Sequence, residues 1–192
     1  LHGFPEYWGM WRPMLEHFGA RGWCAAAPDL RGYNLSEKPA AVEAYRVKPL
    51  VADVLALAAR YTKEKFVLVA HDWGGAVAWS VAISHPERLS RLVMLNSPHP
   101  YVFWRELCAS PGQRAASTYM TLFRLAKAER VLSANGYARL LAWFPGLDPD
   151  YRRELLEAWS QPGALTGGLN YYRASPLYPP TADDPGPRKL QL

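Results

Sequence analysis

Residues 65–84 constrain the fold most strongly, because they join a strand to a helix through a turn that contains two adjacent glycines. The first part reads KFVLVAH, a run of aliphatic, β-branched and aromatic residues that is typical of a buried strand. The second part, WGGAVAWSVAIS, is apolar at helical spacing and stops before His85 and Pro86. A strand that leads through a tight turn into a helix is a building unit of parallel sheets.

The flanking segments alternate in the same way. We expect helices over residues 11–20 and 48–63, a short strand that begins at Cys24, and a buried strand over residues 91–97. Strands that alternate with helices predict an α/β fold, in which helices flank both faces of a parallel sheet. We assign residues 1–97 to this sheet-containing part, which is an incomplete core.

The pattern changes after Ser97. Residues 98–178 carry no strand pattern, and helical spacing recurs between prolines and glycines, which predicts a helical cap inserted after a strand. The helices that we expect there cover residues 117–125, 129–141 and 150–159. Residues 179–192 are rich in proline and read as a return loop.

Composition excludes several classes of protein. Hydrophobic residues make up 49% of the chain and charged residues 20%, which is typical of a globular domain and not of a disordered chain. The net charge of +5 is scattered without a basic stripe, so we expect no nucleic-acid partner. No apolar run reaches the roughly 18 residues of a membrane helix, so we expect no membrane segment and a cytoplasmic location.

Cysteine and histidine usage also limits the chemistry. The two cysteines, Cys24 and Cys108, form no disulfide framework, and Cys24 lies in an apolar run that predicts a buried free thiol. No cluster of His and Cys has the spacing of metal ligands, and no glycine loop is suited to a phosphate. We therefore expect neither a metal nor an organic cofactor.

The turn within residues 65–84 carries a carboxylate, Asp72, at the place where a nucleophile elbow presents its reactive side chain. The dipole and free N–H groups of a helix N-terminus favour an ionised carboxylate, which can attack an alkyl carbon without a base. Gly74 and Gly75 permit the tight turn, and we expect His71 to support it. An Asp before a helix can also act only as a cap, but the surrounding motif favours the nucleophile.

A second motif, HGFPE, covers residues 2–6. Gly3 followed by Phe4 and Pro5 predicts a fixed loop with an accessible backbone N–H, supported by His2. An oxyanion hole needs two such donors. We predict that they are the amides of Phe4 and Trp73.

Together, the segments HGFPE, PDLRGYNLSEKP, HDWGGAVAW and NSPHP resemble the α/β-hydrolase superfamily, and within it the epoxide hydrolases. The resemblance implies an α/β-hydrolase fold with a cap that supplies two tyrosines to the epoxide oxygen. The NYYR stretch matches the family pattern at Tyr172, and an early cap helix offers Tyr119. A phenol is a suitable acid for the alkoxide that forms on ring opening. We expect the neighbouring Tyr171 to serve packing.

The resemblance implies an enzyme that hydrolyses a small apolar epoxide to a vicinal diol, through an alkyl-enzyme ester on Asp72 and without a cofactor. Haloalkane dehalogenases share the HDWGG motif and are the first alternative, although Phe4 stands where they often carry a halide-binding Asn. A hydrolase-fold protein that binds a ligand or partner without turnover is the second alternative.

The family places its remaining catalytic acid and His on loops after the cap. We therefore expect His99 to be structural, and Asn96 cannot serve as the acid. The 192 residues read as a fragment that also lacks the first strands of the sheet. By itself such a fragment is expected to fold poorly, because three parallel strands leave hydrophobic edges bare. If it does fold, we expect it to form the ester once without completing turnover.

Overall fold

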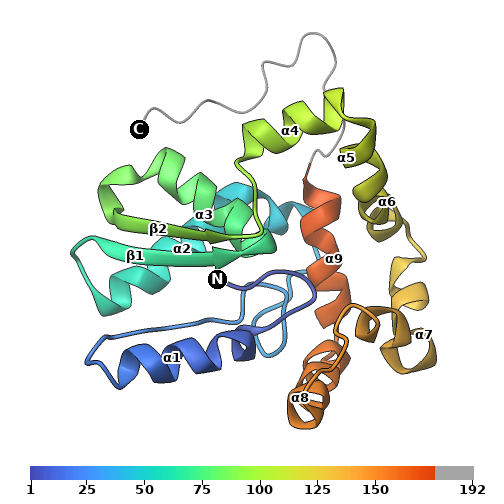
Figure 1. The fold of residues 1–192 in the computed structure, drawn as a ribbon, viewed down its shortest axis with the longest axis horizontal. Helices are drawn as coiled ribbons and strands as arrows, with labels where there is room; N and C mark the ends of the chain where they lie inside the picture. Colours follow the sequence, from blue (N-terminus) through green and yellow to red (C-terminus); the bar gives the residue numbers. More distant parts are fainter. Residues whose placement is uncertain (176–192) are drawn as a thin grey trace.

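The computed structural model describes residues 1–175, and a two-stranded parallel sheet lies in its first part (Figure 1). Strand β1 (Phe66–His71) pairs with β2 (Leu89–Leu95), so that Val69 lies opposite Val93 and His71 opposite Leu95. Helix α3 (Asp72–Ser84) makes the crossover that parallel neighbours require. The strand, turn and helix expected over residues 65–84 and the strand expected over 91–97 are confirmed.

The start of the chain lies beside β1. The backbone nitrogen of Leu1 donates to the carbonyl of Val69 over 2.5 Å, and the N–H of His71 donates to the carbonyl of Leu1 over 3.0 Å. The HGFPE loop therefore leaves from the carboxyl end of β1, next to the turn that follows this strand.

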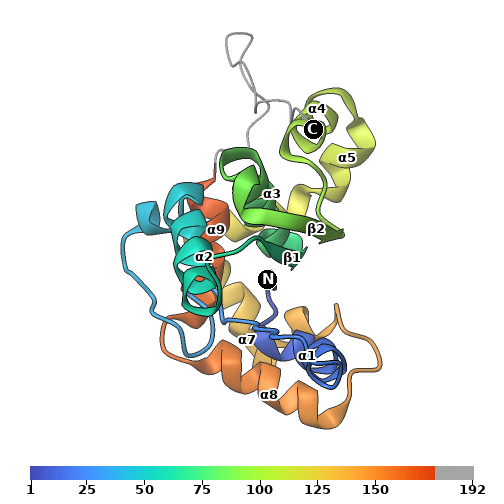
Figure 2. The same cartoon turned by 90° about the vertical axis from the view of Figure 1, so that its left-hand side faces the viewer.

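Helices cover one face of the sheet. Helix α2 (Val47–Tyr61) packs on α3, and α3 contacts both strands (Figures 1 and 2). Side chains alternate across a strand, so Leu68 and Ala70 of β1 enter the buried core, together with Val77 and Val81 of α3. Helix α1 (Arg12–Gly19) and the 3-10 turns Trp8–Trp11, Val42–Tyr45 and Pro86–Arg88 complete this part.

The short strand expected from Cys24 is absent, which corrects the prediction. Residues 24–28 have no assigned secondary structure, and no strand of the described residues pairs with them. A strand needs a neighbour for its backbone groups, so an apolar sequence alone did not produce one. Cys24 is accordingly exposed and not a buried thiol, and Cys108 is exposed too.

The two paired strands are also less buried than their apolar sequences predict. Val67 is 38% exposed, Val93 44% and Leu95 43%. These residues point away from the face that α3 covers, because side chains alternate along each strand. Their hydrophobicity therefore predicted the strands correctly but overestimated their burial.

A run of helices follows β2. The expected helices over residues 117–125, 129–141 and 150–159 correspond to α6 (Thr118–Arg124), α7 (Ala128–Leu141) and α8 (Pro149–Ser160). Helix α7 is interrupted, because residues 134–137 leave the helical conformation. Helices α4 (Pro100–Ala109), α5 (Pro111–Ala116) and α9 (Ala164–Ala174) were not predicted. The side chains of His99, Ser110 and Asp148 cap α4, α5 and α8. The expected return loop, residues 179–192, lies outside the described residues.

Helix α9 joins the two parts of the molecule. It contacts α6, α7 and α8 (Figure 1) and also the turn Val42–Tyr45. Two glycines allow a close approach: a Cβ atom on Gly167 would lie 2.2 Å from the carbonyl oxygen of Gly32. This contact seats α9 on the loop that precedes α2, and its buried residues include Tyr171 and Tyr172.

Candidate active site

Asp72 is the first residue of α3 and has a backbone conformation that is rare for residues other than glycine. Its φ angle is +51°, within the left-handed region. Such strain persists where the surrounding structure holds a side chain in a required position. The turn therefore presents the Asp72 carboxylate at the carboxyl end of β1, as a nucleophile elbow does.

The two glycines after Trp73 are required by their neighbours. A Cβ atom on Gly74 would lie 2.3 Å from the carbonyl oxygen of His2. A Cβ atom on Gly75 would lie 2.3 Å from the Cβ of Ser97. The absence of side chains at both positions thus lets the HGFPE loop and the residues after β2 lie against α3.

The loop of residues 2–6 contacts the Asp72 carboxylate directly. The backbone N–H of Phe4 donates to Oδ1 of Asp72 over 2.7 Å, and the N–H of Trp73 also hydrogen-bonds this carboxylate. Gly3 makes the approach possible, since a Cβ atom there would lie 2.2 Å from the same oxygen. The two amides predicted as oxyanion donors converge on one side chain.

The charge of Asp72 is set by opposing effects. Burial raises the pKa of the Asp72 carboxyl above its ordinary value, while the amides of Phe4 and Trp73 and the nearby His71 oppose that rise. The pKa of Asp72 is raised on balance, because burial is the largest of these effects.

His2 is fully buried and ties the loop to its surroundings. Its Nε2 accepts a hydrogen bond from the N–H of Leu30 over 2.9 Å, and its Nδ1 lies 3.0 Å from the carbonyl oxygen of Gly3. Because a backbone N–H can only donate, Nε2 is unprotonated and Nδ1 carries the hydrogen. Burial lowers the pKa of His2 to about 3, so the ring is neutral and holds the loop by hydrogen bonds.

Both predicted tyrosines lie near Asp72. Tyr172 of α9 is 2% exposed and packs edge-on against Trp73, with 5.0 Å between the ring centroids. Tyr119 of α6 is 42% exposed, and its ring centroid lies 6.4 Å from that of Tyr172. Burial and the charge of Asp72 raise the pKa of both phenols, so both are protonated donors at neutral pH.

Phe123 contributes to the same site and was not singled out in the sequence. It is 1% exposed and contacts the rings of Phe4, Tyr119 and Tyr172 at centroid distances of 5.1, 5.3 and 4.9 Å. Its position four residues after Tyr119 on α6 is the signal that could have identified it, because such residues share a helix face.

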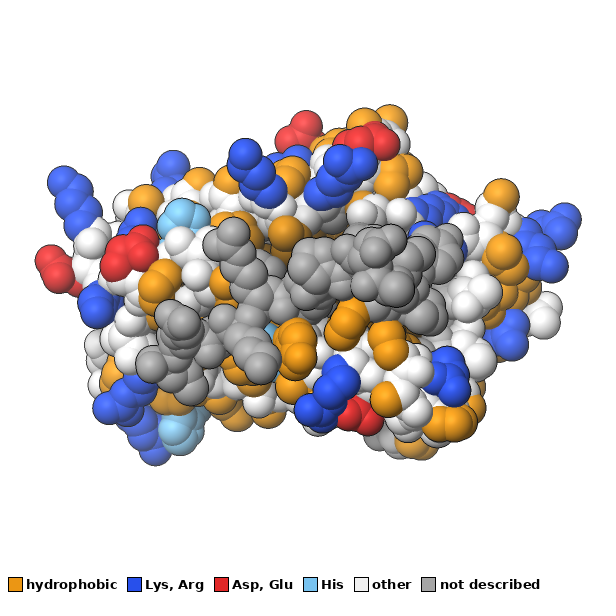
Figure 3. All heavy atoms as spheres, turned by 90° about the horizontal axis from the view of Figure 1, so that it is seen from above, with side chains coloured by type: hydrophobic (Ala, Val, Ile, Leu, Met, Phe, Trp, Pro, Cys, Tyr) orange, Lys and Arg blue, Asp and Glu red, His pale blue; other side chains and the backbone are white. Residues whose placement is uncertain are grey.

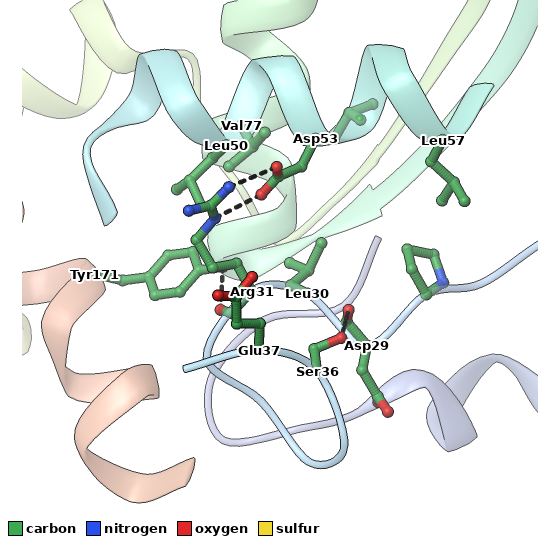
Figure 4. Close-up of a pocket in the computed structure, with 12 residues that line it drawn as sticks. Asp29, Leu30, Arg31, Ser36, Glu37, Leu50, Asp53, Leu57, Val77 and Tyr171 are labelled. Carbon is green, nitrogen blue, oxygen red and sulfur yellow. Dashed lines mark hydrogen bonds and ion pairs between the residues drawn. The ribbon is translucent and has the colours of Figure 1, made fainter. Parts of the chain in front are cut away.

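Tyr171 has a different environment from Tyr172. Its hydroxyl donates to the carbonyl oxygen of Arg31 over 2.8 Å, and the Arg31 guanidinium forms two hydrogen bonds of 2.7 Å with Asp53 (Figure 4). These residues line a cavity of about 230 Å³ that includes neither Asp72 nor Tyr172. The contacts agree with the packing role predicted for Tyr171.

His99 and His71 both lie near the carboxyl ends of strands, where they make structural contacts. His99 accepts a hydrogen bond from the N–H of Tyr101 at Nδ1 over 3.2 Å, and its ring packs on Trp79. This contact begins α4, which fits the structural role expected for His99. His71 connects the end of β1 to the start of the chain through its backbone N–H. Asn96 has a φ angle of +47° in the turn after β2.

Comparison with known proteins identifies the family. A family model described as the alpha/beta hydrolase fold matches residues 1–148. The chain belongs to the alpha/beta hydrolase fold family. This alpha/beta hydrolase fold chain is 42% identical over 91% of its length to the AB hydrolase superfamily protein YfhM of Bacillus subtilis. It is 37% identical over 90% of its length to Epoxide hydrolase 4 of Mus musculus. The chain covers 63% and 51% of these relatives.

Solved structures show the same likeness. An epoxide hydrolase from metagenomes of hot environments has 40% identity and a TM-score of 0.84, covering 96% of this hydrolase-fold chain and 64% of its own. A Bacillus megaterium epoxide hydrolase, solved with an inhibitor, has 33% identity and a TM-score of 0.82, covering 90% and 63%. The chain is therefore epoxide hydrolase-like in sequence and fold.

Within residues 1–175, no group of three or more His, Cys, Asp or Glu side chains could hold a metal ion. None of the helices in that range is both long and apolar enough to cross a membrane. On the face seen in Figure 3, Lys and Arg side chains lie at separate positions with hydrophobic side chains between them.

Proposed function

We propose that this chain carries the ester-forming half of an epoxide hydrolase. A carboxylate oxygen of Asp72 attacks an oxirane carbon, the carbon–oxygen bond of the ring breaks, and an ester bond forms. The ring oxygen leaves with the electron pair and takes a proton from Tyr119 or Tyr172. The observation that carries this proposal is the grouping of both phenols around the elbow. The Tyr172 ring packs on Trp73 with 5.0 Å between the centroids, and the Tyr119 ring lies 6.4 Å from that of Tyr172. The neighbouring Asp72 already accepts a backbone N–H from Phe4.

The electrostatics support this assignment of roles. Both phenols have a raised pKa, so each keeps a proton to donate until an alkoxide, a much stronger base, forms beside it. The Phe4 N–H holds Oδ1 of Asp72, which fixes the orientation of the carboxylate. Held in this way, the carboxylate needs little reorganisation when its charge passes to the alkoxide.

The side chains around the site favour an apolar substrate. Phe4, Phe123 and Trp143 form ring contacts with one another or with the two tyrosines. These aromatic surfaces offer no charged partner to a polar ligand. We propose that residues 1–97 act as the core that presents Asp72 and residues 98–178 as the cap that supplies the phenols.

The second half of the reaction is the attack of water on the ester carbonyl, which releases a vicinal diol. The epoxide hydrolase resemblance places the activating His and its acid partner on loops after the cap. The chain spans 63% and 51% of the two relatives named above. We therefore assign diol formation to the whole protein and ester formation to the residues described above.

Labelling tests the proposal. The chain is incubated with an apolar terminal epoxide, and the intact mass is expected to rise by one epoxide per chain, with the label mapped to the peptide that contains Asp72. The matched control is Asp72→Asn, which is expected to remain unlabelled. A label on another residue, or equal labelling of both proteins, would refute the proposal. Release of halide from a haloalkane without reaction with the epoxide would favour the dehalogenase instead.

A further inference from the structure

Helix α8 holds the loop that donates a hydrogen bond to Asp72. The three residues that follow Phe4 are Pro5, Glu6 and Tyr7, and each is bound by a different residue of α8. Trp159 donates from Nε1 to the Pro5 carbonyl over 2.5 Å, and the Tyr151 hydroxyl donates to Oε2 of Glu6 over 2.5 Å. The Tyr7 hydroxyl donates to Glu154.

This contact is closely packed. Trp159 is 6% exposed, and the rings of Tyr7 and Tyr151 stack with 5.8 Å between their centroids. Arg12 adds an ion pair of 2.8 Å to Glu154. The cavity that lies between this loop, α8 and α9 measures only about 10 Å³. A cavity of this size holds at most one water molecule. The loop therefore has little space in which to move while it packs against α8.

We propose that α8 positions the Phe4 N–H against Asp72, with Trp159 as the principal positioning residue. The Pro5 carbonyl that Trp159 holds belongs to the residue directly after Phe4, so movement of Trp159 moves the donor. A hydrogen bond on a reacting carboxylate is sensitive to displacements of about 1 Å, which can change a rate by about a hundredfold. The positioning of the Phe4 N–H by α8 does not depend on the proposed function, but its expected effect on the rate of ester formation does.

Two single substitutions separate positioning from packing. Trp159→Phe keeps an aromatic ring beside Tyr137 and Phe144 but removes the N–H that binds Pro5. Tyr137→Phe is the matched control, because both hydrogen bonds of the Tyr137 hydroxyl run to α8. It donates to the carbonyl oxygen of Trp159 over 3.2 Å and accepts from Oγ of Ser160 over 3.4 Å. Each substitution removes one hydrogen bond of Trp159, and only one of these bonds reaches the loop.

The first measurement needs no substrate. Amide hydrogen exchange and carbon-13 NMR titration of Asp72 are followed in the 192-residue chain. In Trp159→Phe, the Phe4 amide is expected to exchange about tenfold faster, while the Val69 amide of β1 keeps its rate. The pKa of Asp72 is expected to rise, because the Phe4 hydrogen bond lowers it. Unchanged values in Trp159→Phe, or equal changes in Tyr137→Phe, would overturn the proposal.

The second measurement uses the epoxide. Trp159→Phe is expected to slow single-turnover labelling about tenfold, with little change in the epoxide concentration that gives half the maximal rate. Tyr151→Phe, which releases Glu6, provides an independent variant should Trp159→Phe fail to fold. Labelling at the parent rate in both variants would count against positioning. An unlabelled parent would refute the proposed function, and the exchange data would still decide the role of α8.

Discussion

Gly3 and Asp72 approach so closely that a Cβ atom on Gly3 would lie 2.2 Å from Oδ1 of Asp72. The next residue, Phe4, donates its N–H to that same oxygen. The lack of a side chain at position 3 therefore allows the hydrogen bond at position 4, because the backbone of the loop can lie directly against the Asp72 carboxylate. The candidate site depends on this contact more than on any pair of side chains.

Gly3→Ala is expected to push the loop away from Asp72. The added methyl group has no space, and overpacking of this kind destabilises a protein by about 1–3 kcal/mol. The expected result is a lower midpoint of urea unfolding, together with slower labelling of Asp72 by an epoxide. Gly112→Ala is the control, because its nearest neighbour, Oγ of Ser110, would be 3.7 Å from the new Cβ. A similar loss of stability in both variants would contradict the role given to Gly3.

Removal of either candidate acid is expected to slow ester formation without unfolding the chain. Tyr172→Phe and Tyr119→Phe each take away one proton donor, and general acid catalysis contributes about a hundredfold or more. Single-turnover labelling by an apolar epoxide measures the effect.

Tyr171→Phe is the matched control for the tyrosine variants. It breaks the hydrogen bond to the Arg31 carbonyl, which is worth about 1 kcal/mol of stability, and it is expected to leave the labelling rate unchanged. If Tyr171→Phe slows labelling as much as Tyr172→Phe does, the distinction between a packing role for Tyr171 and an acid role for Tyr172 is wrong.

Asp72→Asn is expected to make the folded chain more stable at neutral pH. Burial raises the pKa of Asp72 above its value in the unfolded chain. For such an acid, the folded state binds more protons, so stability falls as pH rises through the interval between the two values, and the deficit remains above it. Asn has no charge to bury and tolerates a positive φ.

Urea unfolding at two pH values checks the Asp72 prediction. The advantage of Asp72→Asn is expected to be greatest near neutral pH and to shrink towards about pH 4, where the unfolded carboxyl titrates. A lower stability of Asp72→Asn at neutral pH would show that the folded carboxylate is stabilised and not strained.

The residue after Tyr172 is expected to stabilise the helices that carry both phenols. Arg173 forms two hydrogen bonds with Glu129, of 2.6 and 2.8 Å, and one of 3.1 Å with the carbonyl of Leu125. These bonds connect α9 to the first turn of α7 and to Leu125, which directly follows α6. Arg173→Met is expected to lower the free energy of unfolding by about 2 kcal/mol, in the range for bonds to charged groups.

An exposed arginine supplies the comparison for Arg173. Arg153 pairs with Asp150 at side-chain exposures of 62% and 76%, and water screens such exposed pairs, so they add little to stability. Arg153→Met is therefore expected to change stability little. Equal effects of the two substitutions, measured by urea unfolding, would remove the special role given to Arg173.

Local features of the sequence determined the unit around Asp72. The hydrophobic period, the paired glycines and the His85-Pro86 stop depend only on neighbours along the chain, so β1, α3 and the turn between them could be predicted. The Phe4 and Trp73 amides followed from the same reasoning, since a loop after a strand and the first turn of a helix present free N–H groups.

Tertiary structure decided the rest. Residues 24–28 are apolar enough for a strand, but a strand forms only beside a partner, and none of the described strands supplies one. The sequence also contained no local sign that Trp159 would bind Pro5, because the two residues are 154 positions apart and their contact depends on how α8 is packed. The hydrophobic period of a segment indicates which side of its own helix or strand each residue faces. The packing of α6 and α9 around Asp72, and of α8 against the loop of residues 2–6, depends on contacts between elements. No single stretch of sequence contains that information.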